Sequence, residues 1–198
     1  MSADHVERIR AIFDAAASTH RQFAAQGAAR VADAAAAILK ALGAGHKILA
    51  FGNGGSAGDA QHLVTELVVR FEGERRALPA VALTADTSVM TAAANDYGYE
   101  QVFVRQIEAL GAAGDVAIGI STSGRSKNVE AGLEAARSRG LTTIALTGSD
   151  GGRVGTAAAI HVNVPDASTA RVQEVHRTVL HAICALVDRE LGPRGEAG

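Results

Sequence analysis

Hydrophobic positions along the chain follow two different patterns. Residues 1–44 carry apolar side chains at helical spacing, as at Ile12 and Ala16, and contain no proline. Gly27 interrupts this pattern, so the segment predicts two helices in succession. From His46 onward, short apolar runs alternate with helical segments, which is typical of a parallel sheet whose strands are connected by crossover helices.

Five apolar runs predict the strands of that sheet, and none of them alternates apolar with polar residues. Such runs are expected of strands that are buried on both faces. A long final helix is predicted from about Ser168 to Leu191, where Gly192-Pro193 ends it. The predicted strands are 47–51, 80–83, 116–120, 142–146 and 160–164, and the helices between them lie near 56–70, 87–95, 99–110, 126–139 and 153–157.

The length of 198 residues suits one domain with an appended helical segment. We expect residues 1–44 to form a helical segment, residues 45–192 to form the main domain, and residues 193–198 to be a disordered tail. In a sheet of this kind, ligands bind beyond the carboxyl ends of the strands. Motifs at those ends therefore indicate function.

Composition narrows the classes of partner. Aromatic residues make up 4% of the chain and the net charge is −2, which favours neither nucleic acid nor a membrane surface as partner. Cys184 is the only cysteine, so an intramolecular disulfide and a thiolate metal cluster are excluded. The first residues lack the apolar run of a signal peptide, and no run is long enough to span a membrane, so we expect a cytoplasmic protein.

A glycine-rich segment, Gly52-Asn53-Gly54-Gly55-Ser56-Ala57, follows the first predicted strand. Glycines let backbone N–H groups approach an anion, and Ser56 is placed to cap the next helix. A tight turn without a ligand is the alternative. The segment also fits a dinucleotide-binding motif loosely. Such motifs carry an acidic residue about 20 positions after the first glycine, whereas Asp86 lies 34 positions after Gly52.

A serine-rich segment, Ser121-Thr122-Ser123-Gly124-Arg125-Ser126, follows the third predicted strand. Its hydroxyl groups, its glycine and the start of a helix together favour binding of a phosphate group. The alternative is a capped turn, but the density of hydroxyls exceeds what capping requires.

Two helices carry side chains that can bind a metal ion. His62 and Glu66 are four residues apart and share one helix face, where they form either a metal site or a surface hydrogen bond. Gln173 and His181 lie on one side of the final helix, and His181 has apolar neighbours, so it is either a core residue or a ligand. The remaining histidines, His5, His20, His46, His161 and His176, are interpreted as surface or packing residues.

Asn95-Asp96 closes a predicted helix and is either a helix stop or a pair of groups for sugar hydroxyls. Taken together with Ala60-Gln61-His62, Ala94 to Gly98 and Ala170 to His176, these motifs resemble the sugar-isomerase (SIS) domain family. The resemblance covers nearly the whole chain. Arg125 and Lys127 depart from it, because the family more often has smaller or uncharged residues there.

The resemblance implies a three-layer α/β/α fold with a flavodoxin-like, five-stranded parallel sheet and N-terminal helices that pack between subunits of a homotetramer. It also implies active sites at the subunit interfaces and one zinc ion per subunit, held by His62, Glu66, Gln173 and His181. The residues implied to contact the substrate are Asn53, Gly54, Gly55, Ser56, Glu66, Asn95, Asp96, Ser121, Thr122, Ser123, Ser126 and Gln173.

The implied reaction is the conversion of a ketose phosphate, sedoheptulose 7-phosphate, into the aldose D-glycero-D-manno-heptose 7-phosphate, a precursor of activated heptoses for cell-surface glycans. Such a reaction moves a proton through an enediol and requires a base, an acid and stabilisation of charge on oxygen. We expect Glu66 to be the base and His181 the acid.

Two other functions are compatible with this family. A non-catalytic adaptor that binds a replication initiator protein would share the loop motifs, but such members tend to lack the acid–base pair that Glu66 and His181 provide here. A sugar-phosphate sensor of transcription usually carries a separate DNA-binding domain, and the N-terminal segment is too short and too rich in alanine to form one.

Overall fold

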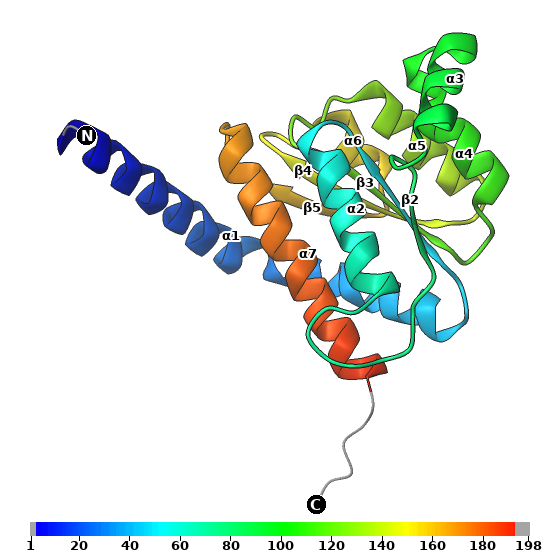
Figure 1. Cartoon of the computed structure of the whole chain (residues 1–198), viewed down its shortest axis with the longest axis horizontal. Helices are drawn as coiled ribbons and strands as arrows, with labels where there is room; N and C mark the ends of the chain where they lie inside the picture. Colours follow the sequence, from blue (N-terminus) through cyan, green and yellow to red (C-terminus); the bar gives the residue numbers. More distant parts are fainter. Residues whose placement is uncertain (1–2, 193–198) are drawn as a thin grey trace, which may run out of the picture.

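Five parallel strands form one sheet in the order β2-β1-β3-β4-β5 in the computed structural model, which describes residues 3–192 (Figure 1). This order is that of flavodoxin-like folds and confirms the predicted fold class. The strands are β1 (Ile48–Gly52), β2 (Ala80–Ala82), β3 (Val116–Ser121), β4 (Thr142–Gly148) and β5 (Ile160–Val164). The predicted tail 193–198 lies outside the described residues.

The three central strands are the buried part of the sheet. Every residue of β1 and β3 is buried, and so is all of β4 except Thr142. The edge strands differ from the prediction, because β2 has no buried residue and β5 has only Val162 and Val164. Each edge strand has a neighbour on one side only, so its outer edge remains accessible.

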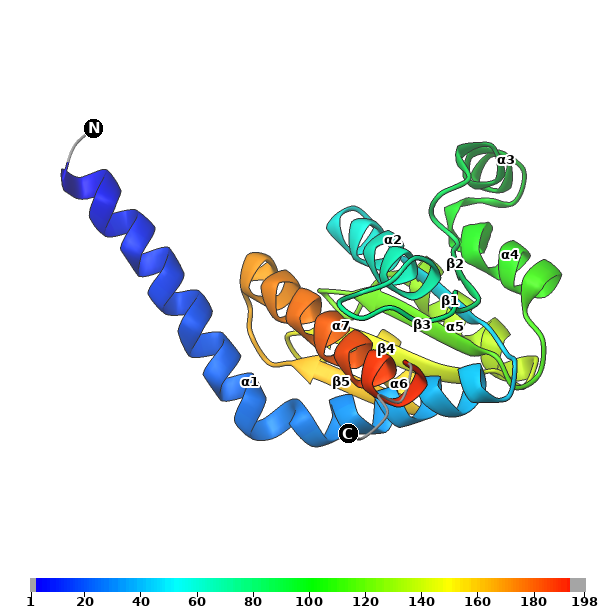
Figure 2. The same ribbon diagram turned by 60° about the horizontal axis from the view of Figure 1, so that its bottom comes forward.

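Helices cover both faces of the sheet. One layer consists of α1 (Ala3–Gly43), α2 (Gly55–Val68) and α7 (Thr169–Leu191), which share a core with one side of the strands. The other layer contains α3 (Thr87–Tyr97), η1 (Tyr99–Gln101), α4 (Val102–Leu110), α5 (Lys127–Ser138) and α6 (Gly152–Ala157). Figure 2 shows α3 at the outer edge of this second layer.

The N-terminal segment is one continuous helix, so the predicted break at Gly27 is wrong. The ribbon changes direction in the middle of α1 without leaving the helical conformation (Figure 2). Gly27 lies directly against the ring of Phe23, where a side chain would overlap the ring. The glycine therefore allows close packing within the helix instead of ending it.

The two halves of α1 have different environments. Ala34, Ile38 and Leu42 in the second half are buried in the core beneath the sheet. The first half projects beyond the body of the molecule and exposes Ile12 and Phe13, whose exposed fractions are 53% and 71% (Figures 1 and 2). Residues 4–18 of α1 thus have no buried side chain within one chain, whereas burial begins at Thr19 and Phe23.

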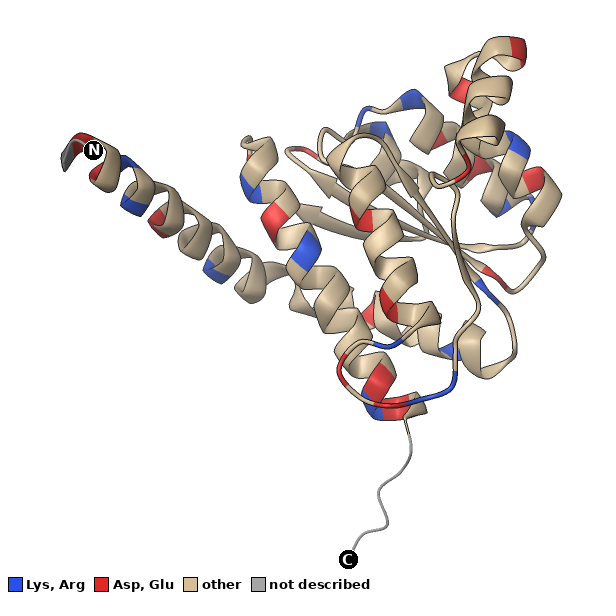
Figure 3. Cartoon of the chain, in the orientation of Figure 1, with Lys and Arg blue, Asp and Glu red and all other residues tan. Residues whose placement is uncertain are grey.

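Basic and acidic residues are intermixed along the ribbon, as expected from the small net charge (Figure 3). Within residues 3–192, no helix combines the length and the apolar character that crossing a membrane requires.

Candidate active site

The carboxyl ends of β1 and β3 lie side by side at the centre of the sheet. Gly52 pairs with Ile120 in the parallel register, so the glycine-rich loop and the serine-rich turn leave the sheet as neighbours. The loop after β1 leads to α2 in one helix layer, whereas the turn after β3 leads to α5 in the other. Such a point, where neighbouring connections leave in opposite directions, is the usual place of a ligand crevice.

The glycine-rich loop is closely packed at both of its ends. A side chain at Gly52 would lie 2.7 Å from the carbonyl oxygen of Ile120, and one at Gly55 would overlap the amide of Gln173. Gly54 has a φ of 56° and precedes α2 as its N-cap residue. Ser56 is therefore inside the first turn of α2, buried, and the prediction that it caps this helix is wrong.

The serine-rich turn gathers its hydroxyl groups around Ser121. The Oγ atom of Ser121 is 2.9 Å from that of Ser126 and 3.4 Å from that of Ser123. Ser126 is the N-cap residue of α5, but its hydroxyl makes no capping bond to the helix. The hydroxyls thus remain available at a helix N-terminus, an arrangement that favours an anion such as phosphate.

Asn53 connects the glycine-rich loop to α5. Its Nδ2 donates to Oδ1 of Asn128 at 2.8 Å, and Nδ2 of Asn128 donates back to Oδ1 of Asn53 at 2.9 Å. The hydroxyl of Tyr99, in η1, also donates to Oδ1 of Asn53 at 2.9 Å. Neither Asn128 nor Tyr99 was predicted from the sequence as part of the site.

The predicted pair Asn95 and Asp96 ends α3 and is exposed. The amide of Asn95 donates to the neighbouring carboxylate of Asp96 at 2.8 Å. The structure does not join these two side chains to the loops after β1 and β3 by any bond among the described residues. Asp86 caps α3 by accepting from the N–H of Val89 at 2.9 Å, which gives that acid a structural role.

The predicted acid–base residues come together between α2 and α7, which lie side by side (Figures 1 and 2). Nε2 of His62 is 2.8 Å from Nε2 of His181 and 3.4 Å from Oε1 of Glu66. These three side chains are half-buried, so they are shielded in part and still accessible to a ligand. The ring of Phe71 lies 5.3 Å from that of His181 and covers it from the side.

Two ion pairs flank these residues. On one side, Arg177 of α7 bonds to the buried carboxylate of Asp59 in α2 at 2.7 Å. On the other side, the buried Arg75 bonds to Asp188 of α7 at 2.7 Å and donates to the carbonyl oxygen of Leu67 at 2.8 Å. Neither ion pair could be predicted from the sequence, because a contact between residues far apart in the sequence depends on how the helices pack.

Burial is the main reason why the pKa of His62 is below its usual value, and the positive charge of Arg177 lowers it further. Burial also raises the pKa of Asp59, against the opposing effect of Arg177. A neutral imidazole is the form that binds a metal ion, so the environment of His62 favours ligation at neutral pH.

Nitrogen and carboxylate donors are the ligands that zinc prefers, and His62, Glu66 and His181 supply such a set. Two imidazole nitrogens bound to one zinc ion at about 2.0–2.1 Å and a tetrahedral angle lie about 3.3 Å apart, so the two histidines would separate by about 0.5 Å. In their present positions, no group of three or more His, Cys, Asp or Glu side chains among residues 3–192 has the spacing of a metal site. The donor chemistry therefore fits zinc, whereas the present spacing of the side chains does not.

Gln173, the fourth predicted ligand, lies two helical turns before His181 on α7. Its amide is packed against Gly55 at the glycine-rich loop. Gln173 therefore lies at the boundary between the loop and the histidine pair, and no bond joins it to His62 or His181 among the described residues.

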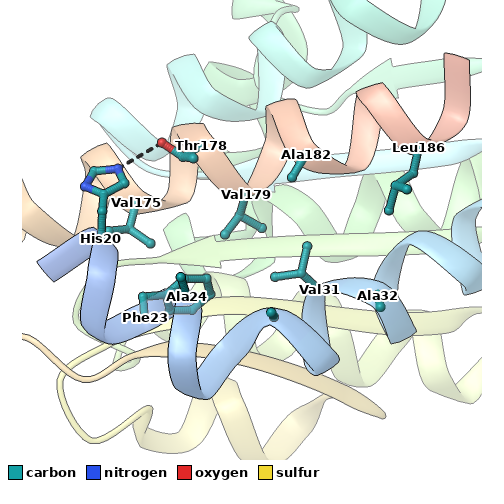
Figure 4. Close-up of a pocket in the computed structure, with 11 residues that line it drawn as sticks. His20, Phe23, Ala24, Val31, Ala32, Val175, Thr178, Val179, Ala182 and Leu186 are labelled. Atoms are coloured by element: carbon teal, nitrogen blue, oxygen red, sulfur yellow. Dashed lines mark hydrogen bonds between the residues drawn. The ribbon is translucent and has the colours of Figure 1, made fainter. Parts of the chain in front are cut away.

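An apolar cavity lies elsewhere, between two helices of the first layer. A cavity of about 300 Å³ between α1 and α7 is lined by Phe23, Val31 and Val179, with His20 bonded to Thr178 at its rim at 2.9 Å (Figure 4). None of the predicted site residues lines it.

Comparison with known proteins gives a consistent result. A sequence model of the SIS domain matches residues 12–148. A protein of Citrifermentans bemidjiense named phosphoheptose isomerase is 54% identical over 166 residues, which cover 84% of this chain and 86% of that protein.

Two solved structures have the same architecture. Phosphoheptose isomerase from Neisseria gonorrhoeae aligns with a TM-score of 0.87 and 43% identity, over 92% of this chain and 98% of that one. A phosphoheptose isomerase from Francisella tularensis aligns with a TM-score of 0.90 and 35% identity, over 96% of this chain and 100% of that one.

Proposed function

From the premise that this chain belongs to the SIS domain family, we propose that it isomerises sedoheptulose 7-phosphate to D-glycero-D-manno-heptose 7-phosphate. Relatives named phosphoheptose isomerase match it at about half of all aligned positions and over most of its length. That agreement supports a sugar-phosphate isomerase, and the choice of a seven-carbon sugar follows the name of these relatives.

The observation that carries the proposal is the meeting of His62, Glu66 and His181. These side chains come from two helices far apart in the sequence, and the two Nε2 atoms approach to 2.8 Å. An acid and a base next to an anion-binding turn are what a ketose–aldose isomerisation requires. This set of groups also favours an enzyme over the adaptor that binds a replication initiator protein.

We assign the proton transfers to two residues. Oε1 of Glu66 faces His62, which leaves Oε2 to remove the proton from the carbon next to the carbonyl group of the sugar. His181 donates a proton to the carbonyl oxygen, which gives the enediol. The proton of the hydroxyl group on the neighbouring carbon then passes to His181, and Glu66 delivers its proton to the former carbonyl carbon, which gives the aldose. Backbone N–H groups and hydroxyls of the serine-rich turn hold the phosphate and keep the reacting carbons at Glu66.

One zinc ion per subunit is part of the proposal. His62, Glu66 and His181 would hold it, with Gln173 as the fourth ligand after its amide turns from Gly55. The chemistry that bound zinc supplies is polarisation of the substrate carbonyl. The half-buried position of the three side chains and the lowered pKa of His62 support this assignment.

We also propose a homotetramer with the active sites near subunit interfaces. The first half of α1 exposes Ile12 and Phe13 along an arm that one chain leaves uncovered. The apolar cavity between α1 and α7 lies further along the same helix, where it is lined by residues between His20 and Ala32 (Figure 4). Burial of these side chains by other copies would remove apolar surface from water.

The test is a turnover assay with identification of the sugar product. We expect Glu66→Gln and His181→Ala each to lower kcat by more than about a hundredfold while the fold is retained, because general acid–base groups contribute about 10²- to 10⁴-fold. A chelator should abolish turnover, zinc should restore it, and dialysed protein should bind about one zinc ion per chain.

Glu134→Gln and His5→Ala, at exposed positions on α5 and α1, are the matched controls. Activity of Glu66→Gln or His181→Ala within about tenfold of the wild type would remove the assigned roles. Absence of turnover in the wild type, together with binding to a replication initiator protein, would establish the adaptor instead.

A further inference from the structure

The loops after β1 and β3 leave the sheet in opposite directions, and one pair of side chains joins them. Asn53 lies on the first loop, and Asn128 lies in the first turn of α5, two residues after Ser126. The two amides exchange hydrogen bonds of 2.8 and 2.9 Å. The pair therefore spans the crevice between the two helix layers at the point where the substrate is expected.

Asn128 is buried, with an exposed fraction of 3%, and both ends of its amide bind the same partner. A buried amide costs free energy unless its polar atoms are hydrogen-bonded, so these two hydrogen bonds hold Asn128 and Asn53 in one arrangement. Ser126 and its contact with Ser121 are fixed by the same turn of α5. The position of Asn53 is thus tied to the serine-rich turn.

Tyr99 fixes the orientation of the Asn53 amide. Oδ1 of Asn53 accepts from both Tyr99 and Asn128, and Nδ2 uses one of its two hydrogens for Asn128. The second hydrogen of Nδ2 has no partner among residues 3–192. That N–H can donate to a hydroxyl or carbonyl oxygen of a sugar.

We propose that Asn128 is a positioning residue, which fixes Asn53 at a set place relative to the phosphate-binding turn so that both ends of a polyol phosphate are held at once. The inference rests on the proposed function, since it takes the serine-rich turn and Asn53 as parts of one substrate site. Asn128 itself acts only through Asn53 and does not touch the substrate.

The test measures binding and does not depend on turnover. The probe is D-glucitol 6-phosphate, an open-chain polyol phosphate without a carbonyl group, titrated in a calorimeter into the metal-loaded protein. Asn128→Asp keeps the size of the side chain but loses the donor to Oδ1 of Asn53. We expect Asn128→Asp and Asn128→Ala each to weaken binding of the probe on the order of tenfold to a hundredfold. Inorganic phosphate should be affected by less than about twofold in Asn128→Ala, because alanine adds no charge next to the serine-rich turn.

Further variants make the result specific. Adding Asn128→Ala to Asn53→Ala should cause no further loss, because Asn128 acts only through Asn53. Asn163→Ala is the control, since Asn163 also makes side-chain hydrogen bonds at this end of the sheet, to Thr147 and Ser149, but none to either loop within residues 3–192.

The proposal is overturned if Asn128→Ala binds the probe within about twofold of the wild type, or if its effect adds to that of Asn53→Ala. An equal loss of affinity of Asn128→Ala for inorganic phosphate would also overturn it, because the turn itself would then be damaged. Failure of the isomerase assignment is seen separately, as absence of wild-type turnover with binding of the probe intact.

Discussion

His176 makes the stability of the protein depend on pH in a way that can be measured. The ring is completely buried in α7, and its Nε2–H donates to the carbonyl oxygen of Thr147 at 2.9 Å. The other ring nitrogen, Nδ1, is buried without a hydrogen-bond partner. Protonation would place a charge and an unpaired N–H in this environment, so burial lowers the pKa of His176 from 6.5 to about 4.

The sign and size of the effect follow from this difference. In the unfolded chain His176 binds a proton below pH 6.5, whereas in the folded chain it stays neutral until about pH 4. Its contribution to the free energy of unfolding is therefore complete above pH 6.5 and falls by about 1.4 kcal/mol per pH unit as the pH drops to 4. The whole loss amounts to about 3 kcal/mol, of which about 2 kcal/mol has occurred at pH 4.5.

The assay compares urea unfolding of the wild type and His176→Gln between pH 7 and 4.5. Protein concentration is held fixed because association affects apparent stability, and a chelator is present because metal binding releases protons. Glutamine cannot titrate, so between these pH values the wild type should lose about 2 kcal/mol more than the variant. His5→Gln, on the exposed part of α1, should follow the wild type. Parallel losses in the wild type and His176→Gln would refute the reasoning.

Two other substitutions test the surroundings of the site. Asp188→Asn leaves the buried guanidinium of Arg75 without its charged partner and should lower the free energy of unfolding by about 3 kcal/mol at pH 7 in urea denaturation, whereas Glu190→Gln, at an exposed position of the same helix, should change it by less than about 0.5 kcal/mol. Equal stability of both variants would contradict this role of the ion pair. Gly55→Ala places a methyl group where the amide of Gln173 now lies, so kcat/KM should fall on the order of tenfold to a hundredfold with little change in stability, because only a flexible side chain must move. Full activity of Gly55→Ala would show that the place of Gln173 is unimportant.

The strands were predictable because burial on both faces requires a continuous run of apolar residues, which can be read from the sequence. The run at 160–164 coincides with β5, and the run at 116–120 falls one residue short of the end of β3. A strand between two others must be apolar throughout, whereas exposure of the edge strand β2 depends on its having no outer neighbour, which no local pattern records.

Helix ends and bends were less predictable. A glycine in a helical pattern can either end the helix or allow close packing, and the sequence does not distinguish the two. At Gly27 the structure shows close packing against Phe23. Ser56 resembles a capping residue in the sequence, but Gly54 takes that position because its positive φ is needed where the loop turns into α2.

Within the site, the spacing of His62 and Glu66 identifies a shared helix face without any knowledge of the fold. Their approach to His181 depends on how α2 and α7 pack, and that became visible only in the structure. Nothing in the sequence indicated Asn128, because a single asparagine in the first turn of a helix is common. Its contact with Asn53 depends on the register of β1 and β3.

The packing of α2 against α7 also has a consequence for synthesis of the protein on the ribosome. The last strand of the sheet ends at Val164, but His181 follows later, in the final helix. A growing chain therefore has all five strands before the helix that covers one face of the sheet has been made. A chain cut short after β5 would leave that apolar face exposed and would lack His181, so it should aggregate instead of folding.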